Sequence, residues 1–163
     1  MLPIGKVDED TLLILASKLG NRYGYGTLLP PVEVPSDSYD ERRGQYDSAR
    51  FLELAMRPNG DRVLGITYAD LFVPGLNFVF GRALLGGKAC VISIARLRHA
   101  EREVFISRVV KEAVHELGHT FGLDHCKDQR CVMFFSNSIS DTDRKGDWYC
   151  DRCGAALNGT GGL

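Results

Sequence analysis

The chain has 163 residues, 44% of them hydrophobic and 25% charged, which fits one ordinary globular domain around one core. Its formal net charge of -1 gives no reason to expect nucleic acid or an anionic membrane surface as a partner. No apolar run approaches the roughly 20 residues that span a bilayer, and residues 1–6 lack the features of a signal peptide. We therefore expect a cytoplasmic protein, and we expect it to act as a monomer.

The first hundred residues alternate between strand-like and helix-like patterns. Strands are expected at residues 2–7, 31–34, 62–68, 76–85 and 88–97. Helices are expected at residues 8–19, where a cap-like Asp8 precedes apolar residues at helical spacing, and at residues 45–56. Residues 35–44 are polar and rich in turn formers, so we expect a surface loop there.

Gly86 and Gly87 join the last two of these strands and favour a hairpin. The order β-α-β-α-β-β-β predicts an α/β (α+β) fold with a mixed, mostly parallel twisted sheet and an antiparallel hairpin member. Residues 76–85 contain Gly81 and Arg82, which edge strands tolerate better than central strands do. We therefore expect this strand at the sheet edge.

The longest helical pattern covers residues 103–121, where apolar residues recur at three- and four-residue spacing. Gly122 follows it and fits a helix stop in the left-handed conformation. Beyond Gly122 the chain is polar, bears cysteines and has little periodicity, so we expect an irregular C-terminal part. The single domain at residues 1–163 is thus divided into a sheet-and-helix part at residues 1–122 and a C-terminal part at residues 123–163.

Residues 115–125 read His-Glu-Leu-Gly-His-Thr-Phe-Gly-Leu-Asp-His. His115 and His119 are four residues apart, which places both imidazoles on one face of the helix, close enough to bind a single ion. Gly122 lets the backbone turn sharply, so that His125 can approach as a third ligand from another direction. Three protein ligands leave one position open for water, which is the arrangement of a catalytic zinc.

Glu116 follows His115 directly and points about 100° away from it around the helix. It can therefore reach water in the open position without displacing a histidine. Zinc lowers the pKa of such a water toward about 7, and Glu116 can accept its proton and later pass it to the leaving amine. The pattern predicts a zinc-dependent metallopeptidase with Glu116 as the general base.

Four of the five cysteines lie in the last 40 residues, and they are Cys126, Cys131, Cys150 and Cys153. Two pairs of thiols fit a closed zinc site with no open position, which makes this ion structural. A redox C-x-x-C is the first alternative, although residues 154–157 are a poor helix start, and a disulfide is the second. Cys90 is expected to be a buried core thiol and His99 a surface residue.

Met133, eight residues after His125, completes the extended histidine signature of the metzincins. The whole pattern resembles the archaemetzincins, because a four-cysteine set begins directly after the third histidine. Residues 77–81, 135–138 and 141–143 also look like that family. The resemblance is strong in the C-terminal half and covers the N-terminal half by the order of elements.

The resemblance implies a compact metzincin-like domain that holds two zinc ions per chain, one catalytic and one structural, with Met133 beneath the histidines. It also implies a shallow cleft, a peptide or protein substrate and, as in some members, aminopeptidase-like activity. A non-catalytic zinc-binding interaction module with the same fold is the competing interpretation, but such a module has no need of Glu116. Tyr149 is a candidate for stabilising the oxyanion.

In metzincins the edge strand is antiparallel to the rest of the sheet and lies above the active-site helix. An extended peptide can add to such a strand by main-chain hydrogen bonds. We therefore expect the substrate to lie along the edge strand with its scissile carbonyl near His115 and Glu116. The residues expected to bind it are Phe78, Val79, Phe80, Gly81, Arg82 and Ala83.

Overall fold

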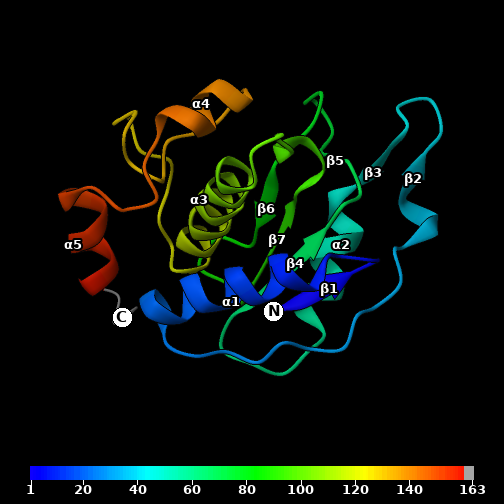
Figure 1. The fold of residues 1–163 in the computed structure, drawn as a ribbon, viewed down its shortest axis with the longest axis horizontal. Helices are drawn as coiled ribbons and strands as arrows, with labels where there is room; N and C mark the ends of the chain where they lie inside the picture. The colour runs from blue at the N-terminus through cyan, green and yellow to red at the C-terminus, as the bar shows by residue number, and fades with distance from the viewer. Residues whose placement is uncertain (160–163) are drawn as a thin grey trace.

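The computed structural model describes residues 1–159, and the last four residues of the expected C-terminal part, 160–163, lie outside them. Figure 1 shows a central sheet with helices on both of its faces and two short helices beside the longest one. Among the helices at residues 1–159, none is both long and apolar enough to cross a membrane.

The main sheet has four strands in the order β1 (Leu2–Ile4), β4 (Val63–Thr67), β7 (Ala89–Ser93) and β6 (Gly81–Ala83). The first three are parallel to their neighbours, and β6 pairs with β7 in the antiparallel direction at the edge of the sheet. The predicted mixed sheet with an antiparallel edge strand is thus confirmed. The edge strand is shorter than the expected 76–85, and β7 ends at Ser93 before a 3₁₀ turn, η2 (Ala95–Leu97).

Helices cover both faces of this sheet. α1 (Glu9–Tyr23) and α3 (Arg102–Thr120) pack on one face, and α2 (Ser48–Met56) packs on the other (Figure 1). Strand side chains alternate between the two cores, since Cys90 and Ile92 join the first and Ala89 and Val91 join the second. Cys90 is fully buried, as its apolar setting predicts.

The start of α1 and the end of α3 have the geometry that the sequence predicts. The Asp8 carboxylate caps α1 by accepting a hydrogen bond from the Thr11 N–H at 2.9 Å. Past α3, Gly122 has a φ of 87°, in the left-handed region. The Gly122 N–H donates to the His119 carbonyl at 2.9 Å and the Leu123 N–H to the Gly118 carbonyl at 3.1 Å, which makes a Schellman end. This end redirects the chain toward His125.

A second, smaller sheet was not expected from the sequence. It has the order β2 (Tyr39–Asp40), β3 (Gln45–Asp47), β5 (Leu71–Phe72) and follows a 3₁₀ turn, η1 (Ser36–Ser38). The expected loop at 35–44 and the expected helix start at residue 45 are therefore wrong. α2 begins only at Ser48, because the Asp47 carboxylate caps it by accepting from the Ala49 N–H. Residues 31–34 form only a single bridge, between Val32 and Ile4.

The C-terminal part is less irregular than predicted. It contains α4 (Ile139–Arg144), which starts with a capping box between Ser138 and Asp141, and α5 (Asp151–Gly159). α5 includes residues 154–157, so the judgement that they are a poor helix start is wrong. Cys153 and Leu157 anchor α5, because both side chains are buried in the core shared with α1 and α3.

Candidate metal and catalytic site

His115 and His119 lie one helical turn apart on α3. Their Nε2 atoms are 3.1 Å apart. The other ring nitrogens are bonded to backbone carbonyls, His115 Nδ1 to Val132 O at 2.8 Å and His119 Nδ1 to Leu123 O at 2.7 Å. Because a carbonyl can only accept, each Nδ1 carries the proton, and each Nε2 is left with a lone pair for a metal.

His125 completes a cluster of three imidazoles. The ring nitrogens that the three histidines offer lie within 4.8 Å of one another. Burial lowers the pKa of all three imidazoles, so the rings are neutral at neutral pH. Two unprotonated nitrogens 3.1 Å apart repel each other unless a cation shares their lone pairs. The donor set therefore fits a zinc ion with three nitrogen ligands.

Glu116 directly follows His115 on α3, and only 5% of its surface is exposed. Burial raises the pKa of its carboxyl well above the ordinary value, and the neighbouring Glu112 adds to this effect, while Lys145 opposes it. No residue of the described chain donates a hydrogen bond to the Glu116 carboxylate. The carboxylate oxygens are not among the fully buried atoms without a partner in the described chain, so they keep some access to solvent, where water or a ligand can reach them.

A buried ion pair lies behind the cluster and was missed in the sequence. Lys145 Nζ is 3.0 Å from Glu112 Oε1, and the Thr142 hydroxyl donates to the same oxygen at 2.9 Å. Lys145 Nζ also donates to the Phe134 carbonyl at 3.4 Å, which ties α3 to the segment after Met133. The sequence did contain a sign of this ion pair. Glu112 lies three residues before His115 on an apolar helix, and a buried carboxylate requires a partner.

Met133 is fully buried and lies against Gly118, at the turn of α3 between His115 and His119. A Cβ atom on Gly118 would be 2.4 Å from Met133 Sδ, so only glycine leaves room for the thioether. The Phe135 ring packs against His125 at 4.8 Å between centroids. The structure thus brings the predicted methionine beneath the histidine pair.

Tyr149 is engaged elsewhere. Its hydroxyl donates to the Val114 carbonyl at 3.0 Å and is 2.6 Å from the Tyr23 hydroxyl. Both partners belong to the helical framework of α3 and α1, which argues against the oxyanion role considered for Tyr149.

The four C-terminal cysteines form a second cluster, and their Sγ atoms lie within 4.8 Å of one another. No disulfide joins any cysteines of the described chain. Burial raises the pKa of the Cys126 thiol, but hydrogen bonds from the Asp128 N–H and from Arg152 outweigh it and bring this pKa to about 7. Cys150 and Cys153 do flank the start of a helix, as in redox motifs, but two further thiols beside them favour a four-sulfur metal site.

The six residues expected to bind substrate do not all lie on the free edge. Phe78, Val79 and Phe80 precede β6, and the Val79 N–H already donates to the Leu71 carbonyl at 2.9 Å. The Arg82 side chain turns toward α2, where its guanidinium donates to the Ser48 hydroxyl at 3.4 Å.

Gly81 and Ala83 remain the candidates for main-chain pairing. The Phe80 carbonyl accepts from the Ser93 N–H, and the Leu84 N–H donates to the Ala89 carbonyl. In an antiparallel pair such bonding alternates, so the N–H and C=O groups of Gly81 and Ala83 point away from β7, toward the open edge.

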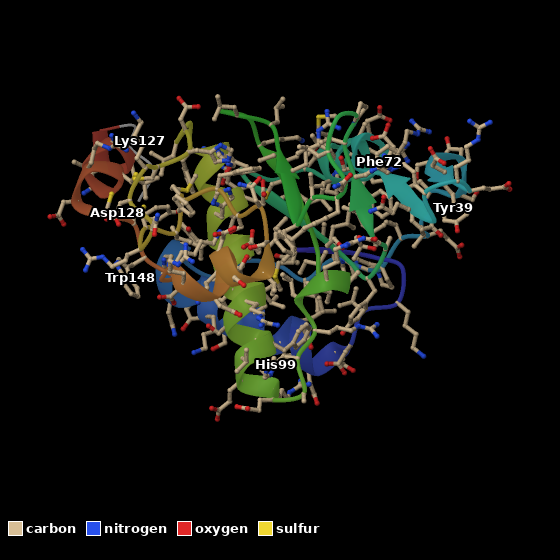
Figure 2. All side chains as sticks on the ribbon, turned by 90° about the horizontal axis from the view of Figure 1, so that it is seen from above. Tyr39, Phe72, His99, Lys127, Asp128 and Trp148 are labelled. Atoms are coloured by element: carbon tan, nitrogen blue, oxygen red, sulfur yellow. The ribbon has the colours of Figure 1, made fainter. Side chains whose placement is uncertain are left out.

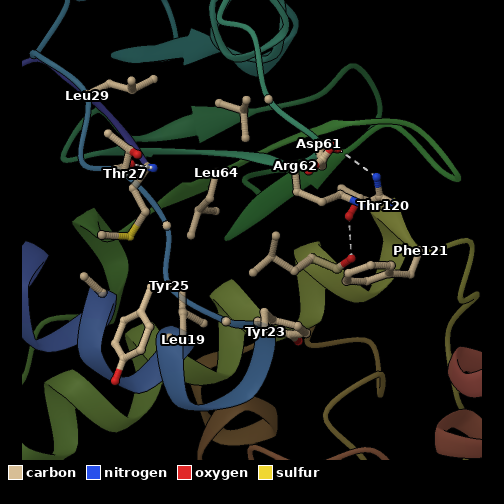
Figure 3. Close-up of a pocket in the computed structure, with 18 of the residues that line it drawn as sticks. Leu19, Tyr23, Tyr25, Thr27, Leu29, Asp61, Arg62, Leu64, Thr120 and Phe121 are labelled. Carbon is tan, nitrogen blue, oxygen red and sulfur yellow. Dashed lines mark hydrogen bonds between the residues drawn. The ribbon is translucent and has the colours of Figure 1, made fainter. Parts of the chain in front are cut away.

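A cavity of about 840 Å³ lies between α1, β4 and the end of α3. Figure 3 shows Tyr23, Arg62, Leu64 and Phe121 among the residues around it. Neither the three histidines nor Glu116 lines this cavity. His99 is exposed, as predicted, and in Figure 2 it lies at the opposite end of α3 from Lys127 and Asp128, which follow Cys126.

Comparisons with known proteins agree with this geometry. Residues 19–159 match the family model described as Peptidase family M54. The archaemetzincin of Methanocaldococcus jannaschii is 44% identical over 158 residues, which cover 93% of this chain and 87% of that one. The crystal structure of the archaemetzincin of Methanopyrus kandleri has a TM-score of 0.89 and 39% identity, covering 98% of this chain and 92% of that chain. The crystal structure of the archaemetzincin of Archaeoglobus fulgidus complexed with malonate has a TM-score of 0.88 and 41% identity. It covers 95% of this chain and 97% of that chain.

Proposed function

Because this chain belongs to the archaemetzincins of peptidase family M54, and is thus a zinc-dependent metallopeptidase, we propose that it hydrolyses peptide bonds at the three-histidine cluster with Glu116 as the general base. The observation that carries this proposal is a cluster of three neutral imidazoles, together with a carboxyl group that directly follows the first of them on α3 and accepts no hydrogen bond from residues 1–159. His115, His119 and His125 would hold the catalytic zinc.

When bound, zinc supplies a Lewis acid that polarises the scissile carbonyl and acidifies water. Glu116 accepts the proton of the attacking water and later delivers it to the nitrogen of the leaving amine. The carboxyl group is suited to both steps, because burial favours its protonated form while Lys145 favours its ionised form. The Val132 and Leu123 carbonyls hold the rings of His115 and His119 in the ligating tautomer.

The substrate is proposed to be an extended peptide or protein segment that pairs with β6. Gly81 and Ala83 each offer one outward N–H and one outward C=O, so a peptide can add to the sheet with two residues in register. Main-chain pairing is largely independent of side chains, so we expect broad sequence preference. We also propose that the enzyme is cytoplasmic and acts as a monomer. Sedimentation of the purified chain tests its oligomeric state.

Cys126, Cys131, Cys150 and Cys153 are proposed to hold the second, structural zinc. Four sulfur ligands leave no open position, so this ion takes no part in hydrolysis. Its contribution is to fold the C-terminal part, and structural zinc ions stabilise small peptides by roughly 10–16 kcal/mol.

The test compares the wild-type chain with Glu116→Ala on a diverse peptide library, with cleavage sites read by mass spectrometry. Loss of the general base should lower turnover by about 10²–10⁴-fold while the zinc content and melting temperature stay unchanged. Glu103→Ala, an exposed glutamate on the first turn of the same helix, is the matched control and should remain active. Full turnover by Glu116→Ala would refute the base assignment. A zinc-loaded wild-type chain that cleaves nothing in the library would favour the non-catalytic module.

A further inference from the structure

Gly81 of the edge strand lies directly against the carboxyl group of Glu116. A Cβ atom built on Gly81 would be 2.5 Å from Glu116 Cγ, 2.5 Å from Oε1 and 2.7 Å from Cδ. Real side chains essentially never approach so closely. The glycine therefore leaves the space that the carboxyl group occupies.

The backbone conformation at this position does not require glycine. Gly81 is not among the glycines with positive φ, so its backbone conformation suits any residue. It lies within a regular strand, opposite Ile92 of β7, and not in a turn. The three atoms nearest to such a Cβ all belong to Glu116, so the Glu116 side chain is the first group that a larger residue would meet.

The position of the Glu116 carboxyl group is in turn set by packing. It is buried, and it accepts no hydrogen bond from residues 1–159 that could hold it in place. The Gly81 backbone therefore limits how far the carboxyl group can move toward β6. The outward N–H and C=O of the same residue face the proposed substrate.

We propose that Gly81 is a positioning residue for hydrolysis. It sets the distance between the Glu116 carboxylate and the peptide that pairs with β6, because one residue contacts both. This inference rests on the proposed role of Glu116 as general base. A displacement of about 1 Å in such a group lowers a rate by about 100-fold, so a single methyl group at this position is enough to test the idea.

The first test is Gly81→Ala in the full zinc-loaded chain. The cheapest relief of the clash is a swing of the flexible Glu116 side chain, so the fold should survive while the base is displaced. We expect kcat to fall by about 100-fold and KM to change by less than about three-fold. The zinc content should be that of the wild type, and a crystal structure of the variant should show the Glu116 carboxylate displaced with the three histidines in place.

The second test is a double-mutant cycle, which separates positioning from a general loss of structure. In a Glu116→Ala background the clashing atoms are gone, so adding Gly81→Ala should change the residual rate by less than about two-fold. Glu116→Asp, whose side chain is one methylene shorter, withdraws the carboxylate from the new methyl group and should itself lower kcat; in that background, adding Gly81→Ala should lower kcat much less than it does in the wild-type chain.

Three outcomes would overturn the inference. They are wild-type kcat in Gly81→Ala, an undisplaced carboxylate, or the same loss of rate in the Glu116→Ala background. Failure of the proposed function has a different signature, because Glu116→Ala itself would then keep full turnover.

Discussion

Gly118 lies between the two helical histidines and makes the contact of Met133 with α3 possible. In Gly118→Ala the new methyl group would meet Met133 Sδ at 2.4 Å and Tyr149 Cε1 at 3.2 Å. We predict a loss of about 1–3 kcal/mol in the free energy of unfolding, together with weaker zinc binding at the histidines, because Met133 must shift. Denaturant unfolding and competition with a chelator measure the two effects.

Gly154→Ala is the matched control, since Gly154 also lies inside a helix and a Cβ there would meet nothing within 4 Å. It should be neutral or stabilise the protein by up to about 1 kcal/mol. Equal behaviour of the two variants would show that the contact between Gly118 and Met133 does not limit stability.

Cys126 should be the most acidic thiol of the reduced, metal-free protein. Its pKa of about 7 lies below the ordinary 9.0, so its thiolate stabilises the fold fully above pH 9 and this stabilisation is lost as the pH falls through about 7. Thiolate absorbance near 240 nm should therefore begin to rise with a midpoint near pH 7.

Arg152→Ala should move that midpoint upward, because the guanidinium that donates to Cys126 Sγ at 3.2 Å is removed. Arg144→Ala, which removes an exposed arginine of α4, should leave it in place. A single titration near pH 9 in the wild-type chain would contradict the assignment.

At the scale of elements, the hairpin of β6 and β7 is hydrogen-bonded to α3. The Gly86 N–H at its turn donates to the His119 carbonyl at 2.9 Å. Ala83→Pro would remove one outward N–H from β6 without touching a proposed zinc ligand. We predict that KM rises at least about 10-fold while the zinc content is unchanged, as measured by peptide kinetics and metal analysis.

Ala83→Ser keeps the N–H and should have a KM close to that of the wild type. If Ala83→Pro binds peptides normally, or if a bound peptide analogue lies away from Gly81 and Ala83, the substrate does not pair with β6.

Sequence periodicity predicted the long elements and failed for the short ones. α3 was expected at 103–121 and spans Arg102–Thr120, because its apolar residues repeat over five turns. Strands of two or three residues, such as β2 and β5, are too short to show any alternation. The sequence predicted too long an edge strand. The Arg43 side chain, from a distant part of the chain, donates to the Leu76 and Asn77 carbonyls and holds that segment as a loop.

At the scale of the whole molecule, the metal clusters were predictable because their spacing is local. His115, His119 and Gly122 fix the geometry of one cluster within two helical turns, and the C-x-x-C pair does the same for half of the other. No spacing in the sequence indicates which distant segments will be in contact. The pairs of Gly81 with Glu116 and of Lys145 with Glu112 join residues more than 30 positions apart, and only the fold brings them together.

A chelator should remove the two proposed ions in sequence. The histidine site has an open position that admits attack, whereas four sulfur ligands enclose the other ion. We predict two zinc ions per chain by metal analysis, with peptidase activity and one ion lost first. The second ion should leave later, at a higher chelator concentration, and its loss should lower the melting temperature. One tightly bound ion per native chain, or four freely reactive thiols besides Cys90, would contradict this.

The peptide bond between His125 and Cys126 belongs to both clusters. Consecutive Cα atoms are about 3.8 Å apart, so His125 is held in place only when Cys126 is. Cys150 and Cys153, which complete the sulfur cluster, follow His125 by 25 and 28 positions in the sequence. A growing chain would therefore contain Glu116 and all three histidines before the sulfur cluster could form. If Cys126 fixes His125 in this way, the proposed histidine site is complete only after Cys153 has been synthesised, and not when His125 itself has been.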